Sequence, residues 1–232
     1  MTSRPSDNFF ATTRWTMVMT AGQSGGAALG ELCESYWFPV YAYVRRRGHM
    51  KEDAEDLTQG FFASLLARGD IAGLRRENGK FRAFLLAAMK HYLANDHDKH
   101  QRLKRGGGAP HLSLDWQQAD LRFRVADENS LPPDAAYDRE WATALLERVL
   151  ETMAAESDER FVHLKSYLSL EREQIPYSTA AAALGLEEGA VRVAVHRLRK
   201  RYRQLLRQEI ARTLAEPELV DEELRSLMEA FG

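Results

Sequence analysis

The sequence contains a single cysteine and no long hydrophobic run. Cys33 has no second cysteine to pair with, so an internal disulfide is excluded, and its apolar-patterned surroundings favour a buried structural thiol. No stretch of uncharged apolar residues approaches the roughly 18 to 20 that cross a bilayer. Residues 1–15 lack the apolar core of a secretory signal. We therefore expect a cytoplasmic protein without a membrane partner.

The residue clusters that serve catalysis are also missing. The glycines at 106–108 follow a predicted helix and precede a proline, so they do not form a phosphate-binding loop. His97 and His100 fall three residues apart on one predicted helix, but the cations Lys90, Lys99 and Arg102 around them disfavour a metal ion. The sequence predicts no catalytic residue, no cofactor and no metal, and therefore no enzyme.

Charge is distributed unevenly although its sum is small. The hydrophobic share of 44% and the charged share of 28% are those of an ordinary soluble protein, and the formal net charge is −2. Residues 80–105 nevertheless hold seven Lys or Arg against two Asp, and residues 192–207 hold seven against no acid. Two separate basic patches suit a protein that touches DNA in two places.

Apolar residues at helical spacing run through most of the chain and predict an all-α protein. Helices are expected at 29–47, 52–68, 81–105, 133–154 and 159–170, with two more in 178–207 and a last one at 218–231. Residues 106–133 open with glycines and lose the periodicity, so we predict an irregular linker there. The chain then divides into small helical domains at 1–105 and 134–215, and an acidic amphipathic tail at 216–232. The predicted inner face of this tail consists of Leu219, Leu224, Leu227 and Met228.

The most informative segment, 178–207, is typical of two helices joined at Gly185. Apolar residues of the second helix recur at alternating steps of four and three, which is the spacing of one buried stripe: Val191, Val195, Leu198, Tyr202 and Leu205. Cations occupy the neighbouring positions: Arg192, His196, Arg197, Arg199, Lys200 and Arg203. A short helix, a glycine-containing turn and a basic second helix are the parts of a DNA-reading helix-turn-helix. A merely solvated basic face is the competing interpretation.

In this order and spacing, the chain resembles a bacterial extracytoplasmic-function (ECF) sigma factor, a compact RNA polymerase initiation subunit. The likeness covers about residues 29–105 and 141–210. It is carried by YWFPVYAYVRRRG from Tyr36, EDAEDLTQGFFASLL from Glu52, GKFRAFLLAAMKHYLANDHDKHQRLKRGGG from Gly79 and AAALGLEEGAVRVAVHRLRKRYR from Ala181. The resemblance implies a first domain that binds core RNA polymerase and melts the −10 promoter element, and a second domain that reads the −35 element.

The resemblance also implies roles for particular residues. The helix DAEDLTQ is similar to the family's core-binding helix, in which Asp53, Asp56 and Gln59 would meet the polymerase. Gly60 stands where the family often has Glu. The third motif is similar to the element that captures single-stranded −10 DNA. Its candidate base contacts are Asn78, Phe81, His91 and Asn95, and its candidate phosphate contacts are Lys80, Arg82, Lys90, Lys99, Arg102 and Lys104.

In the second domain, the resemblance implies that the helix from Glu188 to Gln204 enters the major groove of the −35 element. The candidate DNA contacts are five cations and one histidine: Arg192, His196, Arg197, Arg199, Lys200 and Arg203. Residues 106–133 are similar to the family's linker, whose acid, Asp120 included, would imitate nucleic acid in the polymerase channel; a flexible tether is the competing interpretation. For the tail we favour a cap on the second domain over a docking surface for a regulator.

A stand-alone helix-turn-helix regulator is the alternative to a sigma factor. One such helix covers only a half-site of DNA, so a regulator of this kind would be a dimer, whereas a free sigma factor is expected to be a monomer. A nucleic-acid-processing enzyme would need a metal or nucleophile site that the sequence does not offer. The family also uses anti-sigma factors or other regulatory proteins, and nothing in the sequence selects one of these devices.

Overall fold

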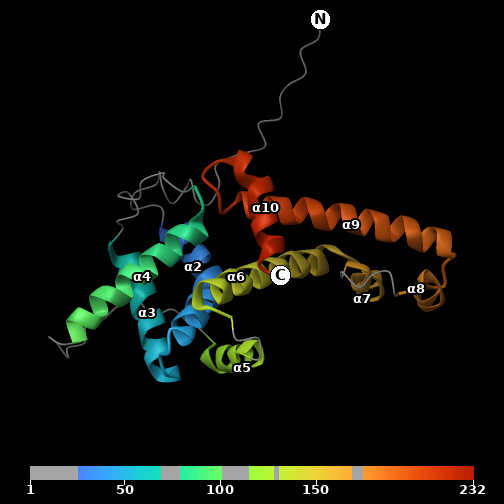
Figure 1. Ribbon diagram of the computed structural model, residues 1–232. Helices are drawn as coiled ribbons and strands as arrows, with labels where there is room; N and C mark the ends of the chain where they lie inside the picture. Colours follow the sequence, from blue (N-terminus) through green and yellow to red (C-terminus); the bar gives the residue numbers. More distant parts are fainter. Residues whose placement is uncertain (1–25, 69–78, 101–114, 128–130, 169–174) are drawn as a thin grey trace, which may run out of the picture. The chain divides into compact units, whose positions relative to one another are not determined.

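The computed structural model describes residues 26–68, 79–100, 115–127, 131–168 and 175–232 (Figure 1). Within these ranges the chain is helical and contains no strand, apart from an isolated bridge between Lys80 and Leu214. The predicted all-α class is therefore confirmed. The chain forms two compact units, one made of Met1–Ala144 with Ala211–Gly232 and the other of Leu145–Ile210.

The first unit is built on three helices, α2 (Gly26–Arg46), α3 (Lys51–Arg68) and α4 (Phe81–His100). A short turn joins α2 to α3 at Gly48, whose φ of +94° suits glycine because it has no Cβ. The three helices pack on one another around fully buried side chains, among them Tyr41, Phe62, Leu85 and Met89. The side chain of Cys33, predicted to be buried, lies outside the described residues.

The predicted irregular linker contains a helix, α5 (Trp116–Asp127), so that prediction is wrong for these residues. The Trp116 ring packs edge-on against Trp37 at 5.4 Å between centroids, and Phe123 packs against Tyr41 at 6.3 Å. Trp116, Ala119 and Phe123 follow helical spacing, but the alternation of Leu121, Phe123 and Val125 with arginines is typical of a strand, so the period was ambiguous. Two other parts of the predicted linker, residues 106–114 and 128–130, lie outside the described residues.

An acidic residue of α5 has a structural partner. Asp120 is 6% exposed, and one of its carboxylate oxygens accepts a hydrogen bond from Arg45 of α2 at 3.0 Å. The same guanidinium lies 4.5 Å from the centre of the Phe123 ring. Asp120 therefore joins α5 to α2 through its ion pair with Arg45. It is not an exposed acid, as the predicted imitation of nucleic acid would require.

The second unit contains the end of α6 (Pro133–Glu156), then α7 (Arg160–Leu164), the 3-10 helix η4 (Lys165–Leu168), α8 (Tyr177–Leu184) and α9 (Glu188–Ala211). The turn between α8 and α9 starts at Gly185, which has a left-handed φ of +64°, and the Leu186 amide donates to the Ala181 carbonyl at 3.0 Å. The small side chains of Ala180 and Ala181 are buried in one cluster with Val191.

The boundaries of the units differ from the predicted domains at 134–215 and 216–232. The start of α6 belongs to the first unit, where Tyr137 and Trp141 are almost completely buried. Residues 211–232 also belong to the first unit, so the tail is not the predicted cap on the second domain. A long helix can bury different parts of its length in different cores, so the change of core falls inside α6 and leaves no glycine or proline signal.

The tail contains the 3-10 helix η6 (Pro217–Leu219) and the helix α10 (Val220–Glu229). Its inner face differs from the predicted one. Val220, Glu223 and Leu227 are buried, whereas Met228 is 58% exposed. The spacing from Val220 to Glu223 and on to Leu227 is that of one helical stripe, so a carboxylate occupies a core position.

Candidate functional site

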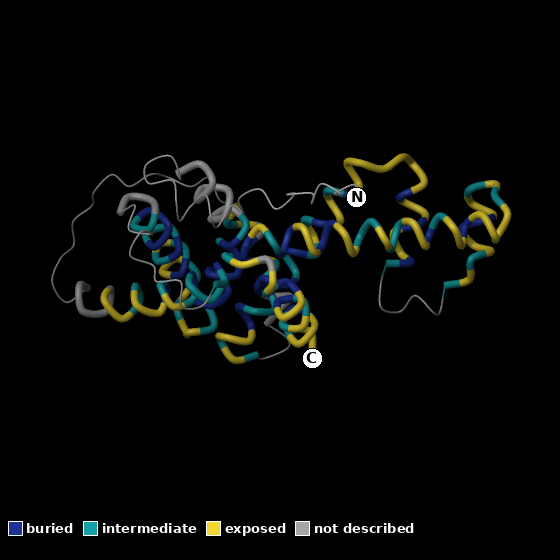
Figure 2. Tube along the Cα trace, turned by 90° about the horizontal axis from the view of Figure 1, so that it is seen from above, coloured by how far each residue is buried: buried dark blue, intermediate teal, exposed yellow. Residues whose placement is uncertain are grey.

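Helix α9 carries exposed cations beside its buried stripe. Val191, Val195 and Leu205 are buried as the spacing predicts, while Leu198 and Tyr202 are half-buried. The basic residues at neighbouring positions are exposed: Arg192, His196, Arg197, Lys200 and Arg203. Figure 2 shows the alternation of exposed and buried positions along the long helices. The side of α9 that faces away from the other helices of the second unit is therefore strongly positive.

Two other arginines of α9 are engaged inside the second unit. Arg201 forms an ion pair with Glu156 of α6, with 2.6 Å between Nη2 and Oε2. Arg199, one of the predicted DNA contacts, is half-buried, and its Nε donates a hydrogen bond to the Tyr167 carbonyl at 3.1 Å. This bond fixes the direction of the Arg199 side chain, because a guanidinium donates in a planar fork.

A surface hollow brings residues of α8 and α9 together. It is lined by Ile175, Pro176, Tyr177, Ser178, Glu188, Arg192 and Arg199. The Arg192 guanidinium lies 5.4 Å from the centre of the Tyr177 ring and 3.9 Å from a Glu188 oxygen. The Tyr177 ring in turn stacks on the buried Tyr167 ring at 5.3 Å. The hollow offers guanidinium groups to an anion, with Glu188 opposing them in part.

Helix α3 presents the acidic residues predicted to dock on polymerase. Asp53 and Asp56 are exposed, and Gln59 is half-buried. They follow one another at intervals of three, which places them along the same side of the helix. A Cβ atom at Gly60 would lie 2.6 Å from the Tyr92 hydroxyl oxygen of α4. The close approach of α4 therefore accounts for a glycine at this position.

Phe81, predicted as a base contact, is fully buried. It begins α4, and its ring packs edge-on against Tyr36 of α2 at 4.9 Å between centroids. Its amide donates to the Thr213 carbonyl at 3.0 Å. The prediction for Phe81 is wrong in this structure, because the side chain completes the core beneath the start of α4 and presents no surface to a base.

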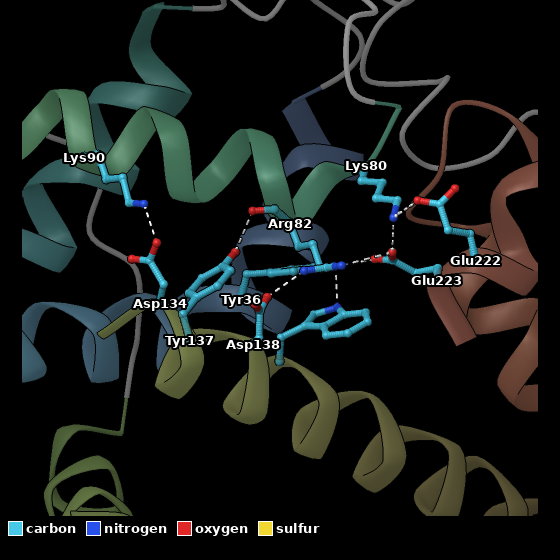
Figure 3. A network of polar contacts seen from close by, with 10 residues as sticks. Tyr36, Lys80, Arg82, Lys90, Asp134, Tyr137, Asp138, Glu222 and Glu223 are labelled. Atoms are coloured by element: carbon cyan, nitrogen blue, oxygen red, sulfur yellow. Dashed lines mark hydrogen bonds and ion pairs between the residues drawn. The ribbon is translucent and has the colours of Figure 1, made fainter. Parts of the chain in front are cut away.

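Lys80 and Arg82, predicted to be free to bind phosphates, are paired with carboxylates of the same unit (Figure 3). Lys80 Nζ lies 2.7 Å from Glu222 Oε1 and 3.0 Å from Glu223 Oε2. Arg82 donates from Nη2 to Glu223 at 3.2 Å and from Nη1 to Asp138 at 2.6 Å. Both cations have side chains that are only 14% exposed. The prediction of open phosphate contacts is therefore wrong for this pair.

The Arg82 side chain joins three helices of the first unit. Its guanidinium lies 4.6 Å from the centre of the Trp141 ring of α6. The backbone carbonyl of Arg82 accepts a hydrogen bond from the Tyr137 hydroxyl at 3.0 Å. The Trp141 indole donates to the Tyr36 hydroxyl at 3.1 Å. Tyr36 and Tyr137 are buried, and burial raises the pKa of both hydroxyls.

The charged members of the cluster stabilise one another. Burial alone would lower the pKa of Arg82, yet its hydrogen bond to Glu223 and the charge of that carboxylate raise it above the usual value. Burial raises the pKa of Asp138 despite the opposing charge of Arg82. The cluster is a salt-bridged core in which Glu223 satisfies two cations at once.

The other predicted −10 residues have mixed outcomes. His91 and Asn95 lie exposed on α4, and Lys90, also exposed, pairs with Asp134 at 2.6 Å. Three candidates, Asn78, Arg102 and Lys104, lie outside the described residues, and so does the side chain of Lys99. The described part of α4 thus keeps its later turns open to a ligand, whereas its first turn is covered.

Sequence reasoning missed the residues that hold Lys80 and Arg82. Glu223 falls three residues after Val220 and four before Leu227, so it shares their buried stripe. An acid on an apolar stripe was the available signal, because buried carboxylates require a cation. Nothing in the sequence, however, indicated that the cations would come from the start of α4.

In the ranges that the structure describes, no group of three or more His, Cys, Asp and Glu side chains is placed to hold a metal ion. No described helix is both long enough and apolar enough to cross a bilayer. Comparison with known proteins finds no matching family model, no similar curated protein and no similar solved structure.

Proposed function

We propose that the chain is a sigma factor of the ECF type, a cytoplasmic subunit that binds core RNA polymerase and directs transcription initiation at promoters with −10 and −35 elements. The observation that carries this proposal is the combination of an exposed acidic face on α3 with an exposed cationic face on α9, each in its own compact unit. The chain contributes recognition, and the polymerase contributes the chemistry.

The cationic face of α9 is suited to duplex DNA. A helix that packs through one stripe can lay its opposite side in a major groove, where Arg and Lys reach guanine edges and phosphates. Arg192, Arg197 and Lys200 project from the exposed side, whereas Arg201 faces Glu156. The hollow at Arg192 and Arg199 offers a place for one backbone phosphate beside the groove.

The acidic face of α3 is suited to a protein partner with basic groups. Asp53 and Asp56 lie at the exposed start of the helix, where charge complementarity steers association and fixes orientation. On α4 we retain His91, Asn95 and Lys90 as contacts to single-stranded DNA and remove Phe81. The ion pair of Lys90 with Asp134 is exposed on both sides, so a phosphate can exchange with that carboxylate.

Run-off transcription with added bacterial core polymerase on a library of promoter sequences tests the function directly. The expected result is initiation that depends on the chain and selects two sequence elements at a fixed separation. Sedimentation should show a monomer when the chain is free. A stable dimer that binds duplex DNA tightly alone, and does not start transcription with polymerase, would instead establish a stand-alone regulator.

Neutralising Lys200 should weaken promoter binding by the holoenzyme, whereas neutralising Arg201 should not. For Lys200→Ala we expect a loss of about 1 to 3 kcal/mol if Lys200 touches a base edge, or a salt slope smaller by about one if it touches a phosphate. Arg201→Ala removes the same charge from the adjacent position, but the Arg201 guanidinium is oriented towards Glu156 by hydrogen bonds from Nε and Nη2 to both carboxylate oxygens. Promoter affinity measured over a range of salt concentrations separates these outcomes, and equal behaviour of the two variants would contradict the assignment of the DNA-facing side.

A further inference from the structure

The chain after α9 lies across the start of α4. The Ala215 amide donates to the Gly79 carbonyl at 2.8 Å, and the Phe81 amide donates to the Thr213 carbonyl at 3.0 Å. A Cβ atom at Gly79, whose φ is +56°, would lie 2.7 Å from a Leu219 methyl group. These contacts bring the acidic first turn of α10 onto the cations that begin α4.

The two carboxylates on Lys80 differ in burial. Glu223 is 1% exposed and also binds Arg82, so it belongs to the core of the first unit. Glu222 has a side chain that is 54% exposed and reaches Lys80 from the solvent side. The hydrogen bond to Lys80 lowers the pKa of Glu222. Burial alone would lower the pKa of Lys80, but its hydrogen bonds to Glu222 and Glu223 raise that pKa above the usual value.

The groups in direct contact around Lys80 and Arg82 carry more negative than positive charge. The two cations Lys80 and Arg82 are in contact with three carboxylates, those of Asp138, Glu222 and Glu223. Two positive and three negative charges give a sum of −1. A phosphate approaching Lys80 would therefore be repelled while Glu222 is in place, although carboxylate and phosphate oxygens make the same kind of bond to an ammonium group.

We propose that Glu222 is an internal competitor of nucleic-acid phosphate for Lys80. This inference rests on the proposed function, in which α4 receives single-stranded DNA. Glu223 stays buried and holds Lys80 and Arg82 in position, while the solvent-exposed Glu222 swings aside when a backbone phosphate takes its place on Lys80. The free chain thereby keeps the start of α4 closed to non-specific nucleic acid.

The test compares the full-length chain with Glu222→Gln and with Glu229→Gln, using a short fluorescent single-stranded oligothymidine as the probe. Glu229 is an exposed acid two turns further along α10, so both variants lose one negative charge from the same helix. We expect Glu222→Gln to bind the probe about three- to fivefold more tightly than Glu229→Gln at low salt. The difference should disappear at high salt, where exposed charges are screened.

Two further measurements make the result specific. Adding Lys80→Ala to Glu222→Gln should remove the gain, since the competition is for that ammonium group. Hydrogen exchange of the wild-type chain should show faster exchange at the start of α10 when the probe is added. Equal probe affinity of Glu222→Gln and Glu229→Gln, in chains that melt at the same temperature, would overturn the competition.

The competition and the proposed function fail in different ways. Loss of the proposed function would appear as a wild-type chain that neither binds core polymerase nor supports transcription. Failure of the competition alone would leave polymerase binding and transcription intact in every variant, with no difference between Glu222→Gln and Glu229→Gln on the probe.

Discussion

Replacing Glu223 by Gln is expected to lower the free energy of unfolding of the first unit by about 1 to 3 kcal/mol. The carboxylate is 1% exposed and binds both Lys80 and Arg82, whose side chains are only 14% exposed. Glutamine has nearly the same shape but no charge, so Lys80 would keep only Glu222 and Arg82 only Asp138, and both cations would lose their buried carboxylate. Urea unfolding followed by circular dichroism measures the change.

Glu222→Gln is the matched control for this prediction. It removes a carboxylate from the same Lys80 ammonium group, but its side chain is 54% exposed. A surface ion pair contributes about 0 to 1 kcal/mol, so this variant should unfold almost as the wild type does. An equally small loss in the two variants would mean that the burial of Glu223 is not what stabilises the Arg82 cluster.

Replacing Asp56 by Arg should reduce the affinity for core polymerase by about a hundredfold or more, because a like charge placed opposite a basic docking surface costs several kcal/mol. Asp56 is exposed on α3, so the substitution should leave the fold intact. Co-elution with core polymerase on a sizing column, followed by transcription from a selected promoter, measures the loss. Melting of the free variant at the wild-type temperature should accompany it.

Glu229→Arg is the control for charge reversal. It makes the same change at an exposed position of the first unit, on α10 and not on α3. We expect this variant to bind polymerase as the wild type does. If Asp56→Arg also bound normally, the acidic face of α3 would not be the docking surface, and the proposed function would lose its first support.

Local periodicity was sufficient to place most helices. The predicted stripe through Val191, Val195 and Leu205 is buried, and Arg192 and His196, one residue later, are exposed, because helical geometry alone decides which positions share a side. The predicted turn residue, Gly185, has the left-handed conformation that ends α8. Helix α5 was missed because Leu121, Phe123 and Val125 alternate with polar residues as in a strand, and the segment stands between glycines and prolines.

The burial and pairing of the predicted −10 residues depend on contacts between distant parts of the chain, and the prediction for Lys80 and Arg82 is wrong for that reason. The resemblance implied that Lys80 and Arg82 would bind phosphates. Their partners, Glu222 and Glu223, are about 140 residues away, at separations of 142 and 141. No local pattern connects residues so far apart, since each helix satisfies its own spacing whichever helix it packs against.

The amino-acid sequence by itself determined the helical class, the acidic side of α3 and the cationic side of α9, because all three depend on residues within a few turns of one another. Only the tertiary structure decided that Phe81 is core, that the tail belongs to the first unit, and that Glu223 is the buried counter-ion of Arg82. The physical reason is that burial and ion pairing depend on which surfaces meet, and a surface is assembled from residues that the sequence keeps apart.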